Sequence, residues 1–331
     1  MRFPEFSGEW VETELQDIVP NICSGKDRIS NSGEVALYGS TGVIGRTNSA
    51  SYKENIVLVA RVGANAGQMQ IGNAPCGVTD NTLVIDAKEW NYYIYYFLQH
   101  YNLNRLVFGS GQPLITGGML KRIKVRYGCK AERNNITRLL CLIDERIATQ
   151  NKIIEKLESL IKGIADKLFQ TARETKLLLE LAPNITSGTD KNGSGTIPLY
   201  GSTGIIGKVK NASQKGNIVL VARVGTIGTV QYVKESCGVS DNALIVEAGE
   251  MTKYIYHFLK TYKFAHITSG TTQPLITASS LKKIAVPTYD IERQTQIVLC
   301  LNILERKLDI EKQYLSDIAM MKQYLLHQMF I

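Results

Sequence analysis

The sequence has few of the residues that build metal sites or disulfide frameworks. It contains only 4 histidines in 331 residues, and its 6 cysteines form no Cys-x-x-Cys pair. Structural zinc sites and small disulfide-rich domains need such residues at short, regular spacings. The sequence therefore predicts neither, and Cys76 and Cys237 are expected to be buried as small apolar side chains.

Long apolar runs are also lacking. The longest ones, such as residues 56–60, have the length of a strand and fall far short of a membrane-spanning helix. The first ten residues lack the apolar core of a secretory signal peptide. We therefore expect a cytoplasmic protein with no membrane partner.

Signatures of catalysis are missing as well. The sequence holds no Gly-x-Ser-x-Gly, no His-Glu-x-x-His and no Asn/Asp-Pro-Pro-Tyr. Residues 201–208 approach a phosphate-binding P-loop, but its spacing is one residue too long, and Val209 stands where a serine or threonine must reach magnesium. We predict no catalytic residue, no metal and no cofactor. An enzyme whose site follows no known motif is the competing class.

What the sequence does contain is an internal repeat. Residues 37–45 return with one change at 199–207, and residues 55–63 return unchanged at 217–225. The offset stays close to 160 residues, which is long enough for each copy to bury its own core. The sequence therefore predicts two homologous domains, and such a duplication suits contact with two similar targets at a fixed separation.

Each copy has a strand-rich and turn-rich first part followed by a long helix. From residue 131 to 170 there is no proline, and apolar residues recur at alternating steps of four and three, the spacing of a coiled coil. The same pattern returns from residue 291 to the C-terminus. We predict β-rich domains at 1–128 and 171–288, and long helices, called the spacer helices below, at 129–170 and 289–331.

The expected fold class is α+β, with two homologous β-rich domains separated by two long helices. A helix of about 40 residues is roughly 60 Å long, too long to wrap inside a domain of this size. We therefore expect the two helices to form an antiparallel coiled coil, with a pseudo-twofold axis relating the halves. The alternative is that each helix packs flat on its own domain.

The net charge of +8 is compatible with a polyanionic partner. Arg61 and Arg223 lie in otherwise apolar strands, where an unpaired guanidinium is costly. Each either pairs with an internal carboxylate or reaches a ligand such as DNA, where arginine contacts guanine or phosphate. Hydroxyl, amide and basic side chains in the turns suit the same contacts. The other candidate DNA-binding residues are Ser40, Thr41, Arg46, Lys53, Asn65, Gln68, Gln112, Ser202, Thr203, Lys208, Lys215, Thr226, Thr229 and Gln273.

Several motifs together resemble a known family. They are the opening Arg-Phe-Pro-Glu-Phe-Ser-Gly-Glu-Trp and the paired Tyr-Gly-Ser-Thr-Gly, Val-Ala-Arg-Val-Gly, Val-(Thr/Ser)-Asp-Asn and Gln-Pro-Leu-Ile-Thr sequences. In these the chain is similar, over nearly its whole length, to the specificity (S) subunit of bacterial type I restriction-modification systems.

The resemblance implies a DNA-binding subunit without catalytic residues. Each recognition domain would bind one half of a split site in double-stranded DNA, and the helices would set the gap. Two methyltransferase (M) subunits would dock on the spacers, and restriction (R) subunits would join them. The chain is short for this family, which leaves open a related type IIB-like enzyme. A coiled-coil adaptor without DNA specificity is the remaining alternative.

Overall fold

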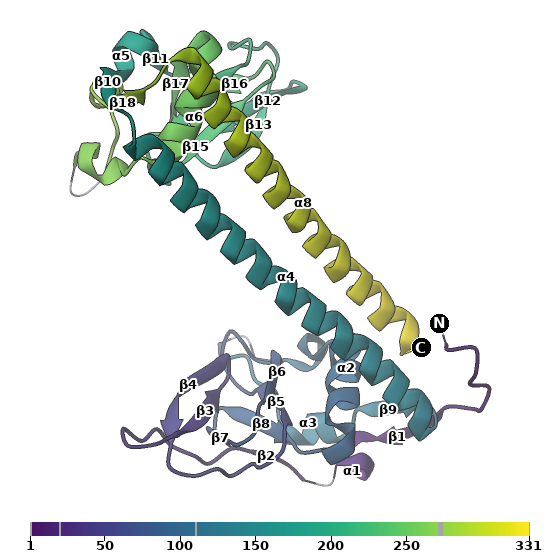
Figure 1. Cartoon of the computed structure of the whole chain (residues 1–331). Helices are drawn as coiled ribbons and strands as arrows, with labels where there is room; N and C mark the ends of the chain where they lie inside the picture. The colour runs from purple at the N-terminus through teal and green to yellow at the C-terminus, as the bar shows by residue number, and fades with distance from the viewer. Residues whose placement is uncertain (1, 20, 110, 271–273, 331) are drawn as a thin grey trace. The chain divides into compact units, whose positions relative to one another are not determined.

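The computed structural model describes residues 2–19, 21–109, 111–270 and 274–330. The chain forms two compact units, shown in Figure 1. Unit 1 combines residues 1–151 with 313–331, and unit 2 comprises residues 152–312. Each unit therefore contains one β-rich domain together with part of both long helices.

Unit 1 contains three small sheets and several short helices. Its strands are β1 (Val11–Glu14), β2 (Ile22–Ser24), β3 (Val35–Gly39), β4 (Gly42–Thr47), β5 (Ile56–Ala60), β6 (Met69–Gly72), β7 (Cys76–Val78), β8 (Thr82–Ile85) and β9 (Lys124–Tyr127). Its helices are α1 (Leu15–Ile18), α2 (Asn91–Tyr101), α3 (Gly117–Lys121) and the start of α4 (Lys130–Gln170), with 3-10 turns at Lys88–Trp90 and Leu103–Leu106. The sheets have the orders β2-β8-β5-β6, β4-β3-β7 and β1-β9.

Unit 2 repeats the same elements in the same order. Its strands are β10 (Glu174–Leu177), β11 (Asn184–Ser187), β12 (Ile197–Gly201), β13 (Gly204–Val209), β14 (Ile218–Ala222), β15 (Val230–Val233), β16 (Gly238–Val239), β17 (Ala243–Glu247) and β18 (Ala285–Thr288). Its helices are α5 (Leu178–Leu181), α6 (Thr252–Thr261), α7 (Ala278–Lys282) and the start of α8 (Ile291–Met329), with 3-10 turns at Gly249–Met251 and Phe264–Ile267. The sheet orders β11-β17-β14-β15, β13-β12-β16 and β10-β18 match those of unit 1, which confirms the two homologous domains.

Strand β5 is buried on both faces, and this explains its continuous apolar sequence. Val57 and Val59 pack into the cluster that contains α2, whereas Ile56 and Leu58 pack against residues of the three-stranded sheet. In unit 2, β14 divides its side chains between two clusters in the same way. Because a strand alternates its side chains between faces, only an all-apolar strand fits this position.

The prediction that Cys76 and Cys237 are buried is confirmed. Both side chains are inaccessible to solvent, and burial raises the pKa of each thiol to about 11. Within the ranges that the structure describes, no three His, Cys, Asp or Glu side chains gather where they could hold a metal ion. None of the helices in these ranges is long and apolar enough to cross a membrane.

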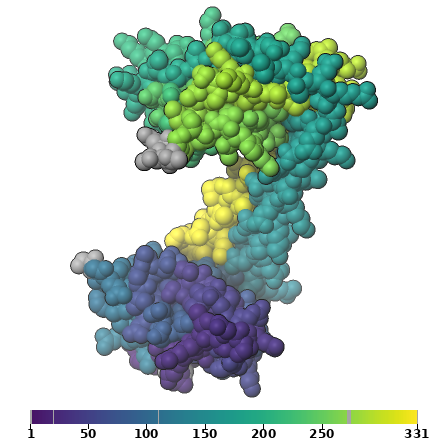
Figure 2. Space-filling model, turned by 90° about the vertical axis from the view of Figure 1, so that its left-hand side faces the viewer, coloured from purple at the N-terminus to yellow at the C-terminus, as the bar shows by residue number. Residues whose placement is uncertain are grey.

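The two long helices pair antiparallel within each unit. In unit 1 the start of α4 meets the end of α8, where Lys322 Nζ lies 2.6 Å from Asp144 Oδ1 (Figure 2, yellow beside teal). In unit 2 the end of α4 meets the residues just before α8, where Tyr289 Oη donates to Leu168 O at 2.5 Å. Nearer the middle of both helices, Lys312 Nζ lies 2.6 Å from Glu158 Oε1. All residues of the two predicted apolar stripes are buried or half-buried. They are residues 139, 143, 147, 154, 157, 161, 164 and 168 on α4, and residues 297, 301, 304, 308, 315, 318 and 325 on α8. The fold class is thus confirmed, while the pseudo-twofold relation between the domains stays a prediction.

In each unit the end of a long helix packs against aromatic side chains at equivalent positions of the domain. In unit 2, Phe169 at the end of α4 contacts Tyr254 and Phe258 of α6, with ring centroids 5.4 and 5.5 Å away. In unit 1, Phe330 beyond the end of α8 contacts Tyr93 and Phe97 of α2 at 5.4 and 5.8 Å. The C-terminal end of the chain therefore completes the core of the first domain.

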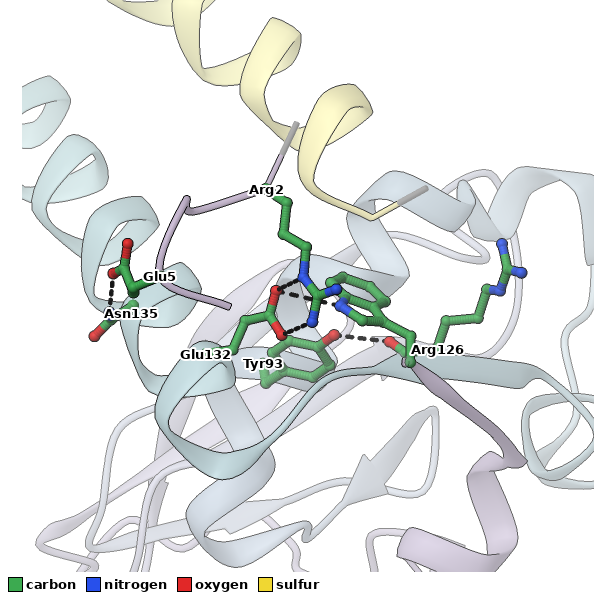
Figure 3. Close-up of polar contacts among 7 residues, drawn as sticks. Arg2, Glu5, Tyr93, Arg126, Glu132 and Asn135 are labelled. Atoms are coloured by element: carbon green, nitrogen blue, oxygen red, sulfur yellow. Dashed lines mark hydrogen bonds and ion pairs between the residues drawn. The ribbon is translucent and has the colours of Figure 1, made fainter. Parts of the chain in front are cut away.

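A cluster of polar contacts attaches the N-terminal segment of unit 1 to α4 (Figure 3). Arg2 donates two hydrogen bonds to the buried carboxylate of Glu132, at 2.6 and 2.8 Å, and Trp10 Nε1 donates a third at 3.2 Å. A buried carboxylate needs such donors, because removing it from water without partners is costly. The opening motif of the sequence thus fixes the first turn of the spacer helix.

We predict that Phe330→Ala and Phe169→Ala destabilise different units. Removal of a buried phenylalanine ring costs about 3–5 kcal/mol, because a cavity replaces packed contacts. Hydrogen exchange should accelerate in α2 for Phe330→Ala and in α6 for Phe169→Ala, and each variant is the control for the other. Unchanged exchange in α2 of Phe330→Ala would show that the end of α8 does not stabilise unit 1.

Candidate nucleic-acid interface

Four loops meet at one end of the domain in unit 1. We call residues 39–42, 61–68, 79–82, 108–109 and 111–114 the unit-1 loop cluster. The carbonyl oxygen of Asn81 accepts hydrogen bonds from Ser40 Oγ at 3.2 Å and from the Arg61 amide at 2.9 Å. The Gly63 amide donates to Pro113 O at 2.9 Å. These contacts join segments that are far apart in the sequence into one surface.

Unit 2 forms the same cluster from equivalent loops. We call residues 201–204, 223–229, 240–242, 269–270 and 274–275 the unit-2 loop cluster. The Arg223 amide donates to Asn242 O at 3.0 Å, and Thr226 Oγ1 donates to Ser202 O at 3.3 Å. The Ile276 amide donates to Arg223 O at 3.0 Å, as Ile115 does to Arg61 O in unit 1. The repeat therefore presents two equivalent surfaces.

The loops that follow β5 and β14 differ in length but close in the same way. The Gly67 amide donates to Ala60 O at 2.9 Å, and the Gly228 amide donates to Ala222 O at 3.0 Å. Both glycines have positive φ, +86° and +79°, a conformation that other residues rarely adopt. The length difference is thus confined to residues 64–66 and 226–227, so the two units keep one framework and present different side chains.

The prediction that Arg61 and Arg223 lie inside strands is wrong in detail. Strand β5 ends at Ala60 and β14 ends at Ala222, so each arginine is the first residue of its loop. Both side chains are half-buried, and neither forms an ion pair with a carboxylate of the described residues. Arg223 Nε is buried without a hydrogen-bond partner among these residues.

For these arginines the sequence left two alternatives, an internal carboxylate or a ligand. Within the described parts of the chain, neither arginine forms the internal salt bridge. Because both side chains remain partly exposed, their guanidinium groups are available to an acceptor that arrives from outside. An arginine at the edge of a loop cluster suits an anionic or base-edge acceptor.

The structure brings eleven of the sequence-predicted residues into the two clusters. The unit-1 loop cluster contains Ser40, Thr41, Arg61, Asn65, Gln68 and Gln112, and the unit-2 loop cluster contains Ser202, Thr203, Arg223, Thr226 and Thr229. Some hydroxyls already donate within the cluster: Thr229 Oγ1, for example, donates to Thr226 O at 2.8 Å. These hydroxyls hold the loops together. Because their O–H groups already donate within the cluster, their oxygen atoms can only accept hydrogen bonds from a ligand. Gln273 lies outside the described residues.

Four predicted basic residues lie toward the other end of the three-stranded sheets. Arg46 is paired with Ala36, far along the hairpin from its turn, and its Nη1 donates to Glu34 O at 2.6 Å. Lys208 occupies the equivalent place opposite Pro198. Lys53 follows Tyr52, which forms an isolated β-bridge with Cys76. Lys215 follows Gln214, which forms the equivalent β-bridge with Cys237. All four are exposed, and the structure does not bring them together with Arg61 or Arg223.

Sequence reasoning missed a glutamine that fixes the hairpin turn in each unit. Gln70 Nε2 on β6 donates to Gly39 O at 2.7 Å, and Gln231 Nε2 on β15 donates to Gly201 O at 2.9 Å. Each bond joins the four-stranded sheet to the β3–β4 or β12–β13 hairpin. The signal was available, because both residues are glutamine at equivalent positions in segments that otherwise differ.

A repeated aspartate was missed as well. Asp27 Oδ2 accepts from the Val78 amide, and Asp190 Oδ2 accepts from the Val239 amide, both at 2.8 Å. Each carboxylate also accepts a hydrogen bond from a nearby serine hydroxyl, Ser51 in unit 1 and Ser213 in unit 2. These contacts anchor the loop before the hairpin to β7 or β16. The aspartates are structural residues of the framework.

This framework is that of a known class of DNA-specificity domain. A family model described as the type I restriction modification DNA specificity domain matches residues 7–159 and again residues 178–320. The chain belongs to this family and contains two copies of its domain. The resemblance to specificity subunits drawn from the motifs is thereby confirmed, as is the assignment to a recognition subunit instead of an enzyme.

Individual relatives agree with this assignment. A type I specificity subunit of Mycoplasma genitalium is 22% identical over 344 residues, covering 92% of this chain and 88% of the relative. A type I restriction enzyme specificity subunit of Haemophilus influenzae is 26% identical over 117 residues. That match covers 34% of this chain and 30% of the relative's length, so the chain spans less than a third of that relative.

A solved structure shares the fold over nearly the whole chain. It is the S subunit of a type I restriction-modification system from M. genitalium, with a TM-score of 0.71 and 18% identity. The alignment covers 98% of this chain and 96% of that one. At this identity the similarity supports the fold.

We predict that Gln70→Met loosens the hairpin turn of unit 1 alone. Methionine keeps the length of the side chain but removes the donor to Gly39 O, and one such hydrogen bond is worth about 1 kcal/mol. Hydrogen exchange of residues 35–47 should rise about fivefold. Gln231→Met should do the same to residues 197–209. Equal exchange in variant and wild type would show that the amide does not hold the turn.

Proposed function

We propose that the chain is the non-catalytic DNA-recognition subunit of a type I restriction-modification complex. Its recognition domains are residues 1–128 and 171–288, and its spacer helices are residues 129–170 and 289–331. The observation that carries the proposal is the repeated specificity domain, each copy with a loop cluster bearing an arginine that has no carboxylate partner among the described residues.

Two clusters on one chain suit a bipartite DNA site. Each cluster would bind one half-site through phosphate contacts that hold the register and base-edge contacts that specify the sequence. Arg61 and Arg223 occupy equivalent positions and would make equivalent contacts. Residues 64–66 and 226–227 differ between the units and would account for differences between the half-sites.

Methylation and cleavage would be carried out by partner subunits. We propose two methyltransferase subunits docked on the spacer helices, with restriction subunits joined to them, in the cytoplasm. In support of a docking surface, α8 carries a second stripe of exposed apolar side chains apart from its buried one, namely Leu299, Ile303, Ile310, Tyr314, Met321 and Tyr324. Leu142, Ile153 and Leu160 are exposed on α4 as well. Exposed apolar side chains that gather on one face are typical of protein interfaces.

The direct test is binding of the purified S–M complex to DNA. Methylome sequencing of the host identifies the site, and mobility shifts compare that site with versions in which either half is scrambled. We expect tight binding only when both halves are intact, and affinity that falls with salt, because phosphate contacts release counterions. Methyl transfer by the chain without M subunits would contradict the proposal, and equal affinity for all sequences would favour the adaptor alternative.

We predict that Arg61→Gln weakens sequence discrimination in one half-site only. A good arginine contact to a base is worth about 1–3 kcal/mol of discrimination, roughly 5- to 150-fold in affinity. The variant should distinguish an intact first half-site from a scrambled one by a factor that is smaller than in wild type by this amount, while its discrimination at the second half-site stays as in wild type. Arg223→Gln should show the reverse. Loss at both half-sites in either variant would indicate a general folding defect instead of a contact.

A further inference from the structure

Two large aliphatic side chains follow the hairpin turn in each unit and are exposed. Val43 and Ile44 of β4 are 57% and 48% exposed, and Ile205 and Ile206 of β13 are 63% and 48% exposed. Single exposed apolar residues are common on protein surfaces. Here an adjacent pair recurs at equivalent positions, although other residues of the same strands change, such as Thr47 to Val209. The pair is therefore a repeated surface feature that the fold alone does not require.

The hairpin holds the second member of each pair in place. A Cβ atom on Gly39 would lie 2.9 Å from Ile44 Cγ2, and one on Gly201 would lie 2.8 Å from Ile206 Cδ1. Each isoleucine thus packs across the glycine of the opposite strand. The side chains are presented by a paired ribbon, so little conformational entropy is lost when they contact a ligand.

The aliphatic pair lies at the same end of the unit as the unpaired arginine. The turn that precedes it is fixed to β6 by Gln70 and to Asn81 by Ser40, and the Arg61 amide donates to the same Asn81 carbonyl. A ligand at this surface must therefore carry apolar groups next to a hydrogen-bond acceptor for the arginine side chain. In a chain with a net charge of +8, a polyanion with exposed methyl groups fits these requirements.

Duplex DNA has one such apolar group on the base edges of its major groove, the 5-methyl group of thymine. The groove is about 12 Å wide and admits a two-stranded β-ribbon. We propose that Val43 and Ile44 contact thymine methyl groups in the first half-site, and that Ile205 and Ile206 do so in the second. This inference rests on the proposed function, and it assigns part of the sequence specificity to the hairpins.

One neighbouring residue makes the two surfaces unequal. In unit 1, Ile29 is 61% exposed and lies over Gly45, with its Cγ1 3.5 Å from where a Cβ would be. In unit 2 the equivalent residue is Asn192, whose Oδ1 accepts from the Lys208 amide at 2.9 Å. The apolar surface beside the hairpin is therefore larger in unit 1. We expect the first half-site to depend more strongly on thymine methyl groups.

The test replaces each thymine of both half-sites, one at a time, by deoxyuridine. This substitution removes the methyl group and leaves every hydrogen-bonding group of the base in place. Binding is measured with the S–M complex of the wild type, of Val43→Thr/Ile44→Thr and of Ile205→Thr/Ile206→Thr. Threonine keeps the β-branched shape that suits a strand, so the hairpins should be retained.

For the wild type we expect about a fourfold loss of affinity for each contacted methyl group that is removed. The Val43→Thr/Ile44→Thr complex should distinguish thymine from uracil less than the wild type does in the first half-site, because each threonine places a hydroxyl where the wild type has an apolar group. It should keep the full wild-type sensitivity in the second half-site, which also controls for folding. The Ile205→Thr/Ile206→Thr complex should show the reverse.

Specific binding by the wild type that is equal for thymine and uracil at every position would overturn the inference and leave the proposed function intact. The inference would equally be overturned if both half-sites consisted only of G·C pairs. It would also be overturned if the variants lost as much affinity as the wild type when thymine is replaced by uracil. A wild-type complex with no preference for any bipartite sequence would contradict the proposed function itself, and the inference with it.

Discussion

Burial of the central strand on both faces is the constraint on which each recognition domain depends. Because β5 and β14 lie between the α2 or α6 layer and the three-stranded sheet, neither strand tolerates a polar side chain until it ends. The first residue after each strand is the arginine, and there the chain leaves the sheet and enters the loop cluster. The apolar run therefore determines where the guanidinium emerges, and the hairpin turn, Gln70 and Asn81 are arranged around that point.

The duplication also explains how one chain completes two cores. Each domain needs a helix end to cover its α2 or α6 aromatic side chains. Unit 2 obtains it from α4 through Phe169, and unit 1 obtains it from the far end of the chain through Phe330. The contacts of Arg2 and Trp10 with Glu132 belong to unit 1, where the first segment of the chain meets the start of α4. The helices are thus part of the recognition domains as well as spacers between them.

Much of this architecture follows from the sequence, because repeats and apolar periodicity report directly on burial. The two domains, the two long helices and the buried Cys76 and Cys237 could all be predicted. The grouping of site residues could not, since it depends on contacts between distant loops. Charge alone suggested Arg46 and Lys208, which lie at the other end of the hairpin, whereas Gln70 and Gln231 gave no signal beyond their recurrence. The exposure of Val43 and Ile44 could not be predicted either, because an apolar sequence segment does not show which of its side chains neighbouring strands cover.

The proposed DNA-binding surface consists of the two loop clusters and the aliphatic pairs that follow the hairpin turns, and of no other part of the domains. Hydrogen exchange of the S–M complex with and without its cognate duplex tests this claim directly. We predict protection at residues 39–44 and 61–68 in unit 1 and at residues 201–206 and 223–229 in unit 2. Protection confined to the basic segments around residues 46–53 and 208–215, with the loop clusters unchanged, would contradict the account.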